Sequence, residues 1–234
     1  MNNKIIISCE HASNKIPNEY RSLFVSNEAH HFLETHLGLD LGAKNAALYL
    51  AKYFSCSFVL AEYSRLLVEL NRSENHPHIF SKFTAQLTDN QKNDLIKNIY
   101  LPYRQKIENL IQESIEQKNR VIHLSIHSFT PKLNNKIRTA DIGLLYDPKK
   151  DLEKKLCSVM KKEQLKDKQY KLKLNYPYRG YSDGFTTYLR TVFGFSNYLG
   201  IEIEINQKHS LNNNFSEDLL ERICYLIKVS VNNL

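Results

Sequence analysis

The order of strand-like and helical segments predicts an α/β protein in which a mixed β-sheet is flanked by helices on both faces, as three layers of a single domain over residues 1–234. Strand-like runs and helical patterns alternate along the whole chain, which is the first observation behind this prediction. The second is the segment LGIEIEI, residues 199–205, whose strict alternation of Ile and Glu is typical of a strand with two different faces. The third is the composition, because 42% hydrophobic and 24% charged residues are close to the globular average, and no repeat or low-complexity linker divides the chain.

The first half of the chain contains three expected strands and three expected helices. The strands cover residues 4–9, 57–62 and 66–70, which are short apolar runs bounded by loop-forming residues. Apolar residues at helical spacing predict helices over residues 27–36, 41–54 and 88–118. Asp40 stands where the N-cap of the second helix would stand, and Pro102, which has no N–H to donate, is expected to kink or split the third.

The second half of the chain continues the alternation. We expect strands over residues 120–126, 140–146, 170–174 and 199–205, with a basic loop over residues 132–138. Helices are expected over residues 151–164 and 185–193, and a last amphipathic helix is expected to run from its N-cap Ser216 to about Val231. Because ligands of such sheets collect beyond the carboxyl ends of the strands, polar residues that follow strands are the first candidates for a site.

Composition and charge exclude several classes of protein. The apolar runs are far shorter than the roughly 20 residues that a membrane span needs, so we expect no membrane association. The N-terminus has neither a long apolar segment nor a small-residue cleavage site, which favours a cytoplasmic location. The four cysteines contain no CxxC pair and are expected to be buried thiols. The net charge of +7 comes from scattered lysines interleaved with acids, so a solvated surface is favoured over nucleic-acid binding.

Polar side chains follow three of the expected strands. His11 comes after the first strand, His127 comes after the strand over residues 120–126, and Glu204 lies near the end of LGIEIEI. Two imidazoles and a carboxylate suit Zn²⁺, and a catalytic zinc site needs three protein ligands and an open position for water. The alternative is that each histidine is a hydrogen-bonded residue at a strand end, since sequence distance does not show that these residues converge.

A second group of polar residues lies in the segment SRLLVELNR, residues 64–72. Arg65 precedes the expected strand, and Asn71 and Arg72 follow it. A planar guanidinium binds a carboxylate through two hydrogen bonds, and an adjacent amide can add a third. This arrangement indicates a substrate with a carboxylate, and the alternative is a structural Arg65 paired to Glu62 or Glu69.

Eight segments together resemble one family over about residues 5–207: ISCEHASNKIP, HLGLDLGAKNAALYLA, YSRLLVELNR, YLPYRQKI, LSIHSFTPKL, DIGLLYDP, NYPYRGYSDGFTT and GIEIEINQ. In this order they are similar to the N-formylglutamate amidohydrolase family. More distantly, LVELNR, LSIHSF and IEIEIN resemble three stretches of the zinc carboxypeptidases. The resemblance implies the zinc-carboxypeptidase-like (phosphorylase/hydrolase-like) form of the three-layer fold.

The resemblance also implies roles for the catalytic residues. His11 and His127 would be metal ligands, and Glu204 would be the general base and later the proton donor to the leaving amine. Glu202 would support Glu204 from the same face of the strand. Glu69 stands where many members of the family have Asp.

The third metal ligand is where the sequence departs from the carboxypeptidase pattern. Those enzymes use His-x-x-Glu, but Asn14 stands three residues after His11. Asp40 is the candidate third ligand, and Glu10 is the alternative. The cofactor is therefore expected to be Zn²⁺ or another divalent metal, because oxygen ligands suit other metals better.

Arginines would recognise the substrate in this scheme. Asn71 and Arg72 would bind its α-carboxylate, while Arg65 or Arg138 would polarise the scissile carbonyl or hold a side-chain carboxylate. The expected partner is thus a small anionic substrate derived from an amino acid.

The function that the resemblance implies is metal-dependent hydrolysis of the N-formyl or N-acyl amide of an acidic amino acid, with N-formyl-L-glutamate giving formate and glutamate. A carboxypeptidase-like peptidase or another N-acyl amino acid deacylase would use the same site with a larger or more open pocket. A non-catalytic basic binding protein is the third alternative, and it would show clustered basic residues and no metal.

Overall fold

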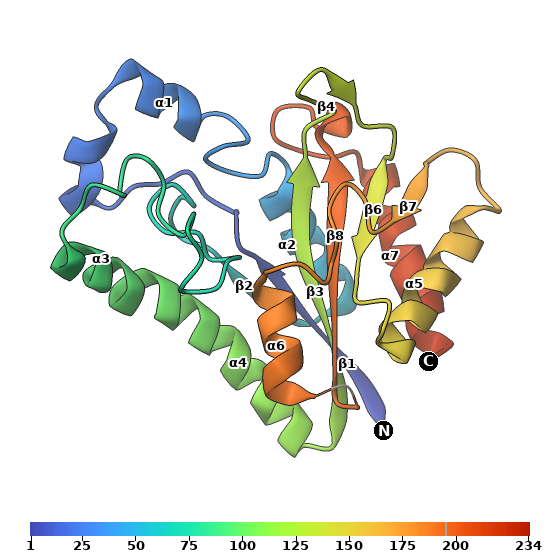
Figure 1. Cartoon of the computed structure of the whole chain (residues 1–234). Helices are drawn as coiled ribbons and strands as arrows, with labels where there is room; N and C mark the ends of the chain where they lie inside the picture. The colour runs from blue at the N-terminus through green and yellow to red at the C-terminus, as the bar shows by residue number, and fades with distance from the viewer. Residues whose placement is uncertain (195) are drawn as a thin grey trace.

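A computed structural model describes residues 1–194 and 196–234. Its centre is a six-stranded mixed sheet with the strand order β2-β1-β3-β8-β6-β7. Strands β2, β1, β3 and β8 are parallel, whereas β6 runs antiparallel to β8 and parallel to β7. The predicted mixed α/β sheet flanked by helices is therefore confirmed (Figure 1).

The elements have the following bounds. The strands are β1 (Asn2–Cys9), β2 (Ser57–Leu60), β3 (Asn119–Phe129), β4 (Lys132–Leu133), β5 (Lys136–Ile137), β6 (Ile142–Leu145), β7 (Leu172–Leu174) and β8 (Tyr198–Asn206). The α-helices are α1 (Asn27–Leu33), α2 (Ala43–Phe54), α3 (Asp89–Leu95), α4 (Leu101–Glu116), α5 (Asp151–Gln164), α6 (Phe185–Phe193) and α7 (Glu217–Asn232). Strands β4 and β5 form a separate small hairpin where a basic loop was expected.

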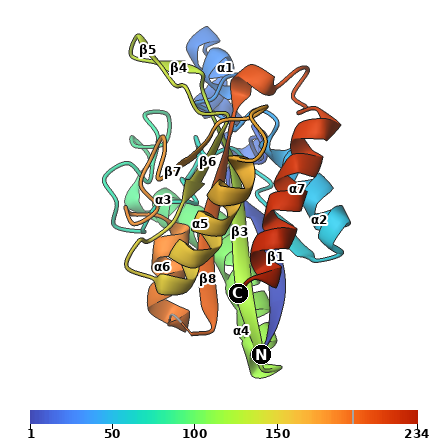
Figure 2. The same cartoon turned by 90° about the vertical axis from the view of Figure 1, so that its right-hand side faces the viewer.

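Helices cover both faces of the sheet. Helices α4 and α6 pack on one face, and α2, α5 and α7 pack on the other, as the two perpendicular views show (Figures 1 and 2). The face under α2 and α7 is apolar and includes the buried Ile201, Ile203 and Ile205 of β8. Burial of these branched side chains against helices supplies the main stabilisation of the sheet. In the part of the chain that the structure describes, no helix is long and apolar enough to span a bilayer.

The segment at residues 66–70 is not a strand, contrary to the prediction. Leu66 and Leu67 are both buried, so this run lacks the alternation of a half-exposed strand. Hydroxyl groups replace the hydrogen bonds of a sheet neighbour here: Ser81 donates to the Leu66 carbonyl (2.5 Å) and Thr84 to the Leu67 carbonyl (2.9 Å). The apolar run at residues 66–70 predicts a strand because a segment that is buried on all sides has the same sequence pattern whether its backbone is extended or turned.

The long helix over residues 88–118 is interrupted as predicted, but the irregularity precedes the proline. A π-helical stretch, Ile96–Tyr100, separates α3 from α4, and Pro102 lies in the first turn of α4. A proline lacks the N–H that an inner helical turn requires, and a wider turn before it removes the clash of its ring. Thr88 caps α3 with a reciprocal capping box, so its start is set locally.

Candidate active site

The carboxyl ends of three neighbouring parallel strands bring the predicted site residues together. His11 follows the end of β1 by two residues, and His127 lies near the end of β3. In the register of β3 and β8, His127 is paired with Glu204. Because paired residues of adjacent strands point to the same side of a sheet, the sheet alone places these two side chains next to each other.

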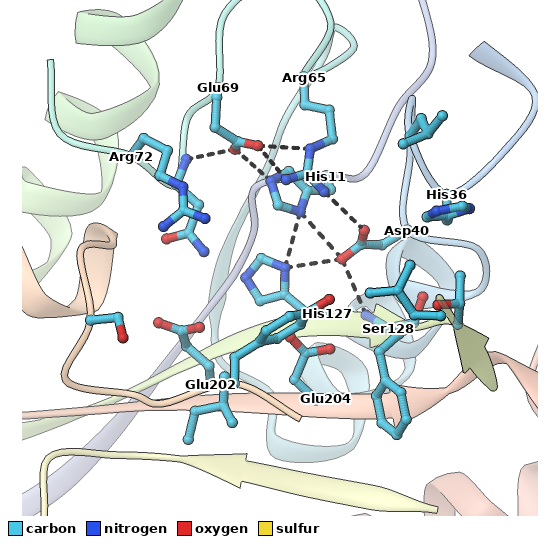
Figure 3. Close-up of a pocket in the computed structure, with 18 of the residues that line it drawn as sticks. His11, His36, Asp40, Arg65, Glu69, Arg72, His127, Ser128, Glu202 and Glu204 are labelled. Atoms are coloured by element: carbon cyan, nitrogen blue, oxygen red, sulfur yellow. Dashed lines mark hydrogen bonds and ion pairs between the residues drawn. The ribbon is translucent and has the colours of Figure 1, made fainter. Parts of the chain in front are cut away.

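His11, Asp40 and His127 point toward one another in a buried triangle (Figure 3). Asp40 Oδ2 lies 3.2 Å from His11 Nδ1 and 3.0 Å from His127 Nδ1, and the two Nδ1 atoms are 3.2 Å apart. Of the two carboxylates considered as a third ligand, the geometry brings Asp40, and not Glu10, into this triangle.

Asp40 reaches this position because it does not cap the following helix. Helix α2 has Gly42 at its N-cap position, with no side-chain cap. The Asp40 backbone instead donates to the His11 carbonyl (3.0 Å), and its carboxylate accepts from the backbone N–H of Ser128 (3.2 Å). Burial raises the pKa of Asp40, but the charges and hydrogen bonds of both histidines outweigh burial and hold it well below its ordinary range.

A carboxylate holds the far nitrogen of each histidine. His11 Nε2 lies 2.6 Å from Glu69 Oε1, and His127 Nε2 lies 3.0 Å from Glu10 Oε2. Ser125 donates to Glu10 and is 2.8 Å from His127 Nε2. Such carboxylate–imidazole pairs fix the ring orientation and the tautomer and direct the opposite nitrogen at the triangle.

The donor set fits a divalent metal. Tetrahedral zinc ligands at about 2.1 Å from the ion lie about 3.4 Å from one another. The three donor atoms of the triangle are already 3.0 to 3.2 Å apart, and both histidines have the outer carboxylate partners that metal-bound histidines have.

Glu204 is buried beside the triangle with one carboxylate oxygen unused. Among the described residues nothing makes a hydrogen bond with Glu204 Oε2, although the atom is inaccessible to solvent. Burial, reinforced by the negative charges of Asp40 and Glu202 against the opposing charge of His127, raises the pKa of Glu204 to about 8. A buried, unpartnered carboxylate oxygen is costly for stability and is typical of a functional group.

Glu202, unlike Glu204, has a hydrogen-bond partner on a neighbouring helix. It lies on the same face of β8, as predicted, and accepts a hydrogen bond from Thr186 of α6 at 2.7 Å. Its carboxylate is thereby tied to α6, whereas that of Glu204 is not.

Arg65 forms the structural pair that the sequence left open as an alternative. Its Nε donates to Glu69 Oε2 at 2.7 Å, its Nη2 pairs with the same oxygen, and Nη1 lies 3.6 Å from Asp40 Oδ1. The arginine therefore neutralises the two carboxylates that hold His11. At 3.6 Å, Nη1 is beyond hydrogen-bond distance of Asp40, and Arg65 is one of the residues that line the cavity.

Asn71 and Arg72 lie on the wall of the same cavity. Asn71 Oδ1 accepts a hydrogen bond from the backbone N–H of Phe185 (2.8 Å), so the amide nitrogen of Asn71 is the part of its side chain that can bind another group. One Arg72 nitrogen donates to the Asp183 carbonyl at 2.9 Å. Arg104 of α4 donates a hydrogen bond to the backbone carbonyl of Arg72 (3.3 Å), which fixes the backbone at residues 71–72.

The site opens into a cavity of about 670 Å³. His11, Asp40, Arg65, Asn71, Arg72, His127, Glu202 and Glu204 all line it. Arg138, predicted to bind substrate, is not among the lining residues. It donates to Thr130 (3.2 Å) and Tyr178 (3.2 Å) and so supports the cavity wall from behind.

The sequence predicted Glu69 only as a partner of Arg65, and it assigned no role at the site to the other residues that hold it from outside. Glu69 and Ser125 orient the two histidines, and Arg104 and Arg190 anchor loops that face the cavity. A partial signal existed for Ser125, because it alternates with His127 along one strand and must therefore lie on the same face. The arginines gave no such signal, since a buried arginine on an amphipathic helix looks like a surface residue in sequence.

Comparison with known proteins identifies the class, which is that of hydrolases acting on amide bonds. More particularly, a model of the N-formylglutamate amidohydrolase family matches residues 3–210, and the chain belongs to that family. The predicted family resemblance is therefore confirmed. No curated protein sequence matches this chain.

Two solved structures share the fold. A gene product of Agrobacterium tumefaciens is 24% identical, with 98% of this chain and 91% of that chain covered and a TM-score of 0.85. An N-formylglutamate amidohydrolase from Ralstonia eutropha is 16% identical, with 98% and 93% covered and a TM-score of 0.72. Both structures are similar to this chain along almost its whole length.

Proposed function

We propose that the chain hydrolyses the N-formyl amide of an acidic amino acid with the help of a bound divalent metal, Zn²⁺ being the first choice. N-formyl-L-glutamate would give formate and L-glutamate. The observation that carries the proposal is the buried triangle of His11, Asp40 and His127 with an unpartnered carboxylate oxygen of Glu204 beside it. Family membership supports the reaction type.

His11, Asp40 and His127 would hold the metal. When bound, it would supply a Lewis acid that lowers the pKa of water and polarises the carbonyl of the substrate. Glu69 and Glu10 keep the two imidazoles oriented, and exclusion of bulk water from this buried corner strengthens every charge interaction within it.

The substrate's carboxylate binds Asn71 and Arg72. A guanidinium and an amide on adjacent residues can surround one carboxylate with charge-assisted hydrogen bonds. Their segment is held by Phe185 and Arg104, so little conformational freedom is lost on binding. The amide to be cleaved then lies between this segment and Glu204.

A cation held by the neighbouring triangle would favour the ionised form of Glu204, and this carboxylate takes the proton from the attacking water as the new C–O bond forms at the formyl carbon. The oxyanion that develops faces the N–H groups of Arg65 Nη1, which can donate to it. Glu204 then passes its proton to the amine nitrogen as the C–N bond breaks. The products are formate and the free amino acid, and Glu204 returns to its starting state.

A second candidate function is deacylation of a larger N-acyl amino acid. The cavity of about 670 Å³ falls within the range of sites that hold drug-sized ligands. Part of its wall is apolar, formed by Leu37, Phe129, Leu133 and Tyr178. A bulkier acyl group could pack against this wall.

The test is release of L-glutamate from N-formyl-L-glutamate by zinc-loaded protein, measured for the wild type, Glu204→Gln and Glu113→Gln. Glu113 is an exposed carboxylate on α4 and serves as the matched control. We expect wild-type and Glu113→Gln to be equally active and Glu204→Gln to lose on the order of 10²- to 10⁴-fold in kcat. An inactive wild type with bound metal would refute the substrate, and cleavage of N-acetyl or N-benzoyl amino acids would then favour the second candidate.

A further inference from the structure

Three arginines line the cavity, and they differ in how far their charges are already balanced. Arg65, Arg72 and Arg179 are the three. A substrate derived from an acidic amino acid brings two carboxylates, so two of these guanidinium groups must be available to bind them. The contacts of each arginine decide which two.

Arg65 is balanced by its own surroundings. It pairs with Glu69 through two nitrogens and lies close to Asp40. Because Glu69 already uses its Nε and Nη2, the side-on fork of Arg65 is not open to a substrate carboxylate, while Nη1 keeps an N–H for a single hydrogen bond. Arg65 is therefore unsuited to hold a substrate carboxylate.

No acidic side chain among residues 1–194 and 196–234 forms an ion pair with Arg72. Its side chain donates to the backbone carbonyl of Asp183, and Asn71 precedes it in the sequence. The pair provides a positive charge and an amide at one point of the wall, which matches one carboxylate.

Arg179 also lacks an acidic partner among the described residues. Its guanidinium lies 6.0 Å from the centroid of the Tyr181 ring. Arg179 belongs to the same loop as Asp183, the residue to which Arg72 donates. The loop therefore carries Arg179 and also binds Arg72, and both guanidinium groups line the same cavity.

The backbone that carries Arg179 is fixed although its side chain is exposed. The next residue, Gly180, donates to Asn175 Oδ1 (3.0 Å), and its carbonyl accepts from Arg190 (2.7 Å). A Cβ at Gly180 would lie 2.1 Å from the backbone nitrogen of Tyr146, so only glycine fits this close against the end of β6.

Arg190 is itself a rigid anchor for this loop. It is buried, its Nε donates to Glu153 Oε1 (2.8 Å) and a further nitrogen donates to the Gly200 carbonyl (2.7 Å). An exposed arginine would ordinarily lose much side-chain and backbone freedom on binding a ligand. Here the backbone at Arg179 is already fixed when the protein folds, so little backbone conformational entropy remains to be lost on binding.

We propose that Arg179 binds the side-chain carboxylate of the substrate and makes the enzyme selective for dicarboxylic over monocarboxylic N-acyl amino acids. This inference rests on the proposed function. Arg72 and Asn71 hold the α-carboxylate, and Arg179 holds the second carboxylate from the facing loop. Selectivity then comes from a residue that takes no part in the chemical step.

The first test compares kcat/KM for N-formyl-L-glutamate and N-formyl-L-glutamine, which differ only in the charge of the side-chain end. Replacement by Arg179→Gln should lower kcat/KM for N-formyl-L-glutamate by about 10- to 100-fold, the range for a lost charged hydrogen bond, and change that for N-formyl-L-glutamine by less than about threefold. Arg179→Lys should retain part of the preference, because the charge stays while the fork is lost.

The control is Arg120→Gln, which removes the same charge at the amino-terminal end of β3, far along the strand from His127. It should leave the ratio of the two substrates unchanged. An equal fall for both substrates in Arg179→Gln, or no fall for N-formyl-L-glutamate, would overturn the inference.

A binding measurement separates this inference from the proposed function. Isothermal calorimetry with glutarate and with its monoamide requires no turnover. Wild type should bind glutarate at least about tenfold more tightly than the monoamide, and Arg179→Gln should bind both alike. If the wild type fails to hydrolyse any N-formyl substrate yet shows this pattern, the proposed reaction fails and the role of Arg179 stands. If the wild type binds both equally, the role of Arg179 fails.

Discussion

His123 provides a test of how the interior of the sheet controls ionisation. The ring is completely buried on β3, with Nδ1 2.8 Å from the Tyr198 hydroxyl and Nε2 2.8 Å from Ser8 Oγ. Burial lowers the pKa of His123 to about 4, against an ordinary value of about 6.5. Both hydroxyl partners are neutral and do not offset the loss of solvation that a charged ring would suffer.

The sign of the effect on stability follows from proton binding. Between pH 6.5 and pH 4 the unfolded chain protonates His123 and the folded chain does not, so the free energy of unfolding falls as the pH falls. Each tenfold change in proton affinity is worth about 1.4 kcal/mol. Integrated from pH 7 to pH 5 with the folded and unfolded pKa values, the loss is about 2 kcal/mol.

The assay is urea unfolding at pH 7 and pH 5 for the wild type, His123→Gln and His123→Phe. Groups away from His123 contribute equally to all three proteins, so the difference between their pH dependences reports on His123 and the charges next to it. The wild type should lose about 2 kcal/mol more than either variant between the two pH values. Equal pH dependence in all three, or a His123 ring that titrates near pH 6.5 in an NMR titration of the folded wild type, would refute the reasoning.

Two further predictions concern the site. Arg104→Met removes the donor that holds the Arg72 carbonyl, so we expect KM for N-formyl-L-glutamate to rise about tenfold with a smaller change in kcat. Arg104→Lys should recover part of the loss. Steady-state kinetics in which kcat alone fell would contradict this prediction. Addition of Zn²⁺ at 100 times its Kd should stabilise the wild type by about 2.7 kcal/mol and raise its Tm, whereas the Tm of His11→Ala should not rise. Equal rises in Tm for both proteins would place the metal elsewhere.

The sequence predicted the elements whose signals are local. The alternation over residues 199–205 predicted β8 and its two faces, and Ser216 marked the start of α7, where its side chain accepts from the Leu219 N–H. The helices over residues 151–164 and 185–193 were predicted with the bounds of α5 and α6. Periodicity and capping are properties of consecutive residues, so a single sequence contains them.

What the sequence did not contain is the set of contacts between distant segments. The run at residues 66–70 turns because hydroxyls of Ser81 and Thr84 bind its carbonyls. Arg138 was expected at the substrate and instead contacts Tyr178 behind the wall, a contact made only once the chain has folded. The grouping of His11, His127 and Glu204 was predictable because parallel strands align their ends, but the carboxylates that orient the histidines come from other parts of the chain.

The pairing of β3 with β8 also constrains how this protein can change over evolutionary time. Glu204 lies beside His127 because the two strands are in one register, with Ile203 and Ile205 directed to the opposite face. Gain or loss of one residue within β8 would exchange an acid for an isoleucine at the site and bury a carboxylate among the helices on the other side. Insertions and deletions should therefore be tolerated in the connecting loops and excluded from these two strands, unless they come in pairs.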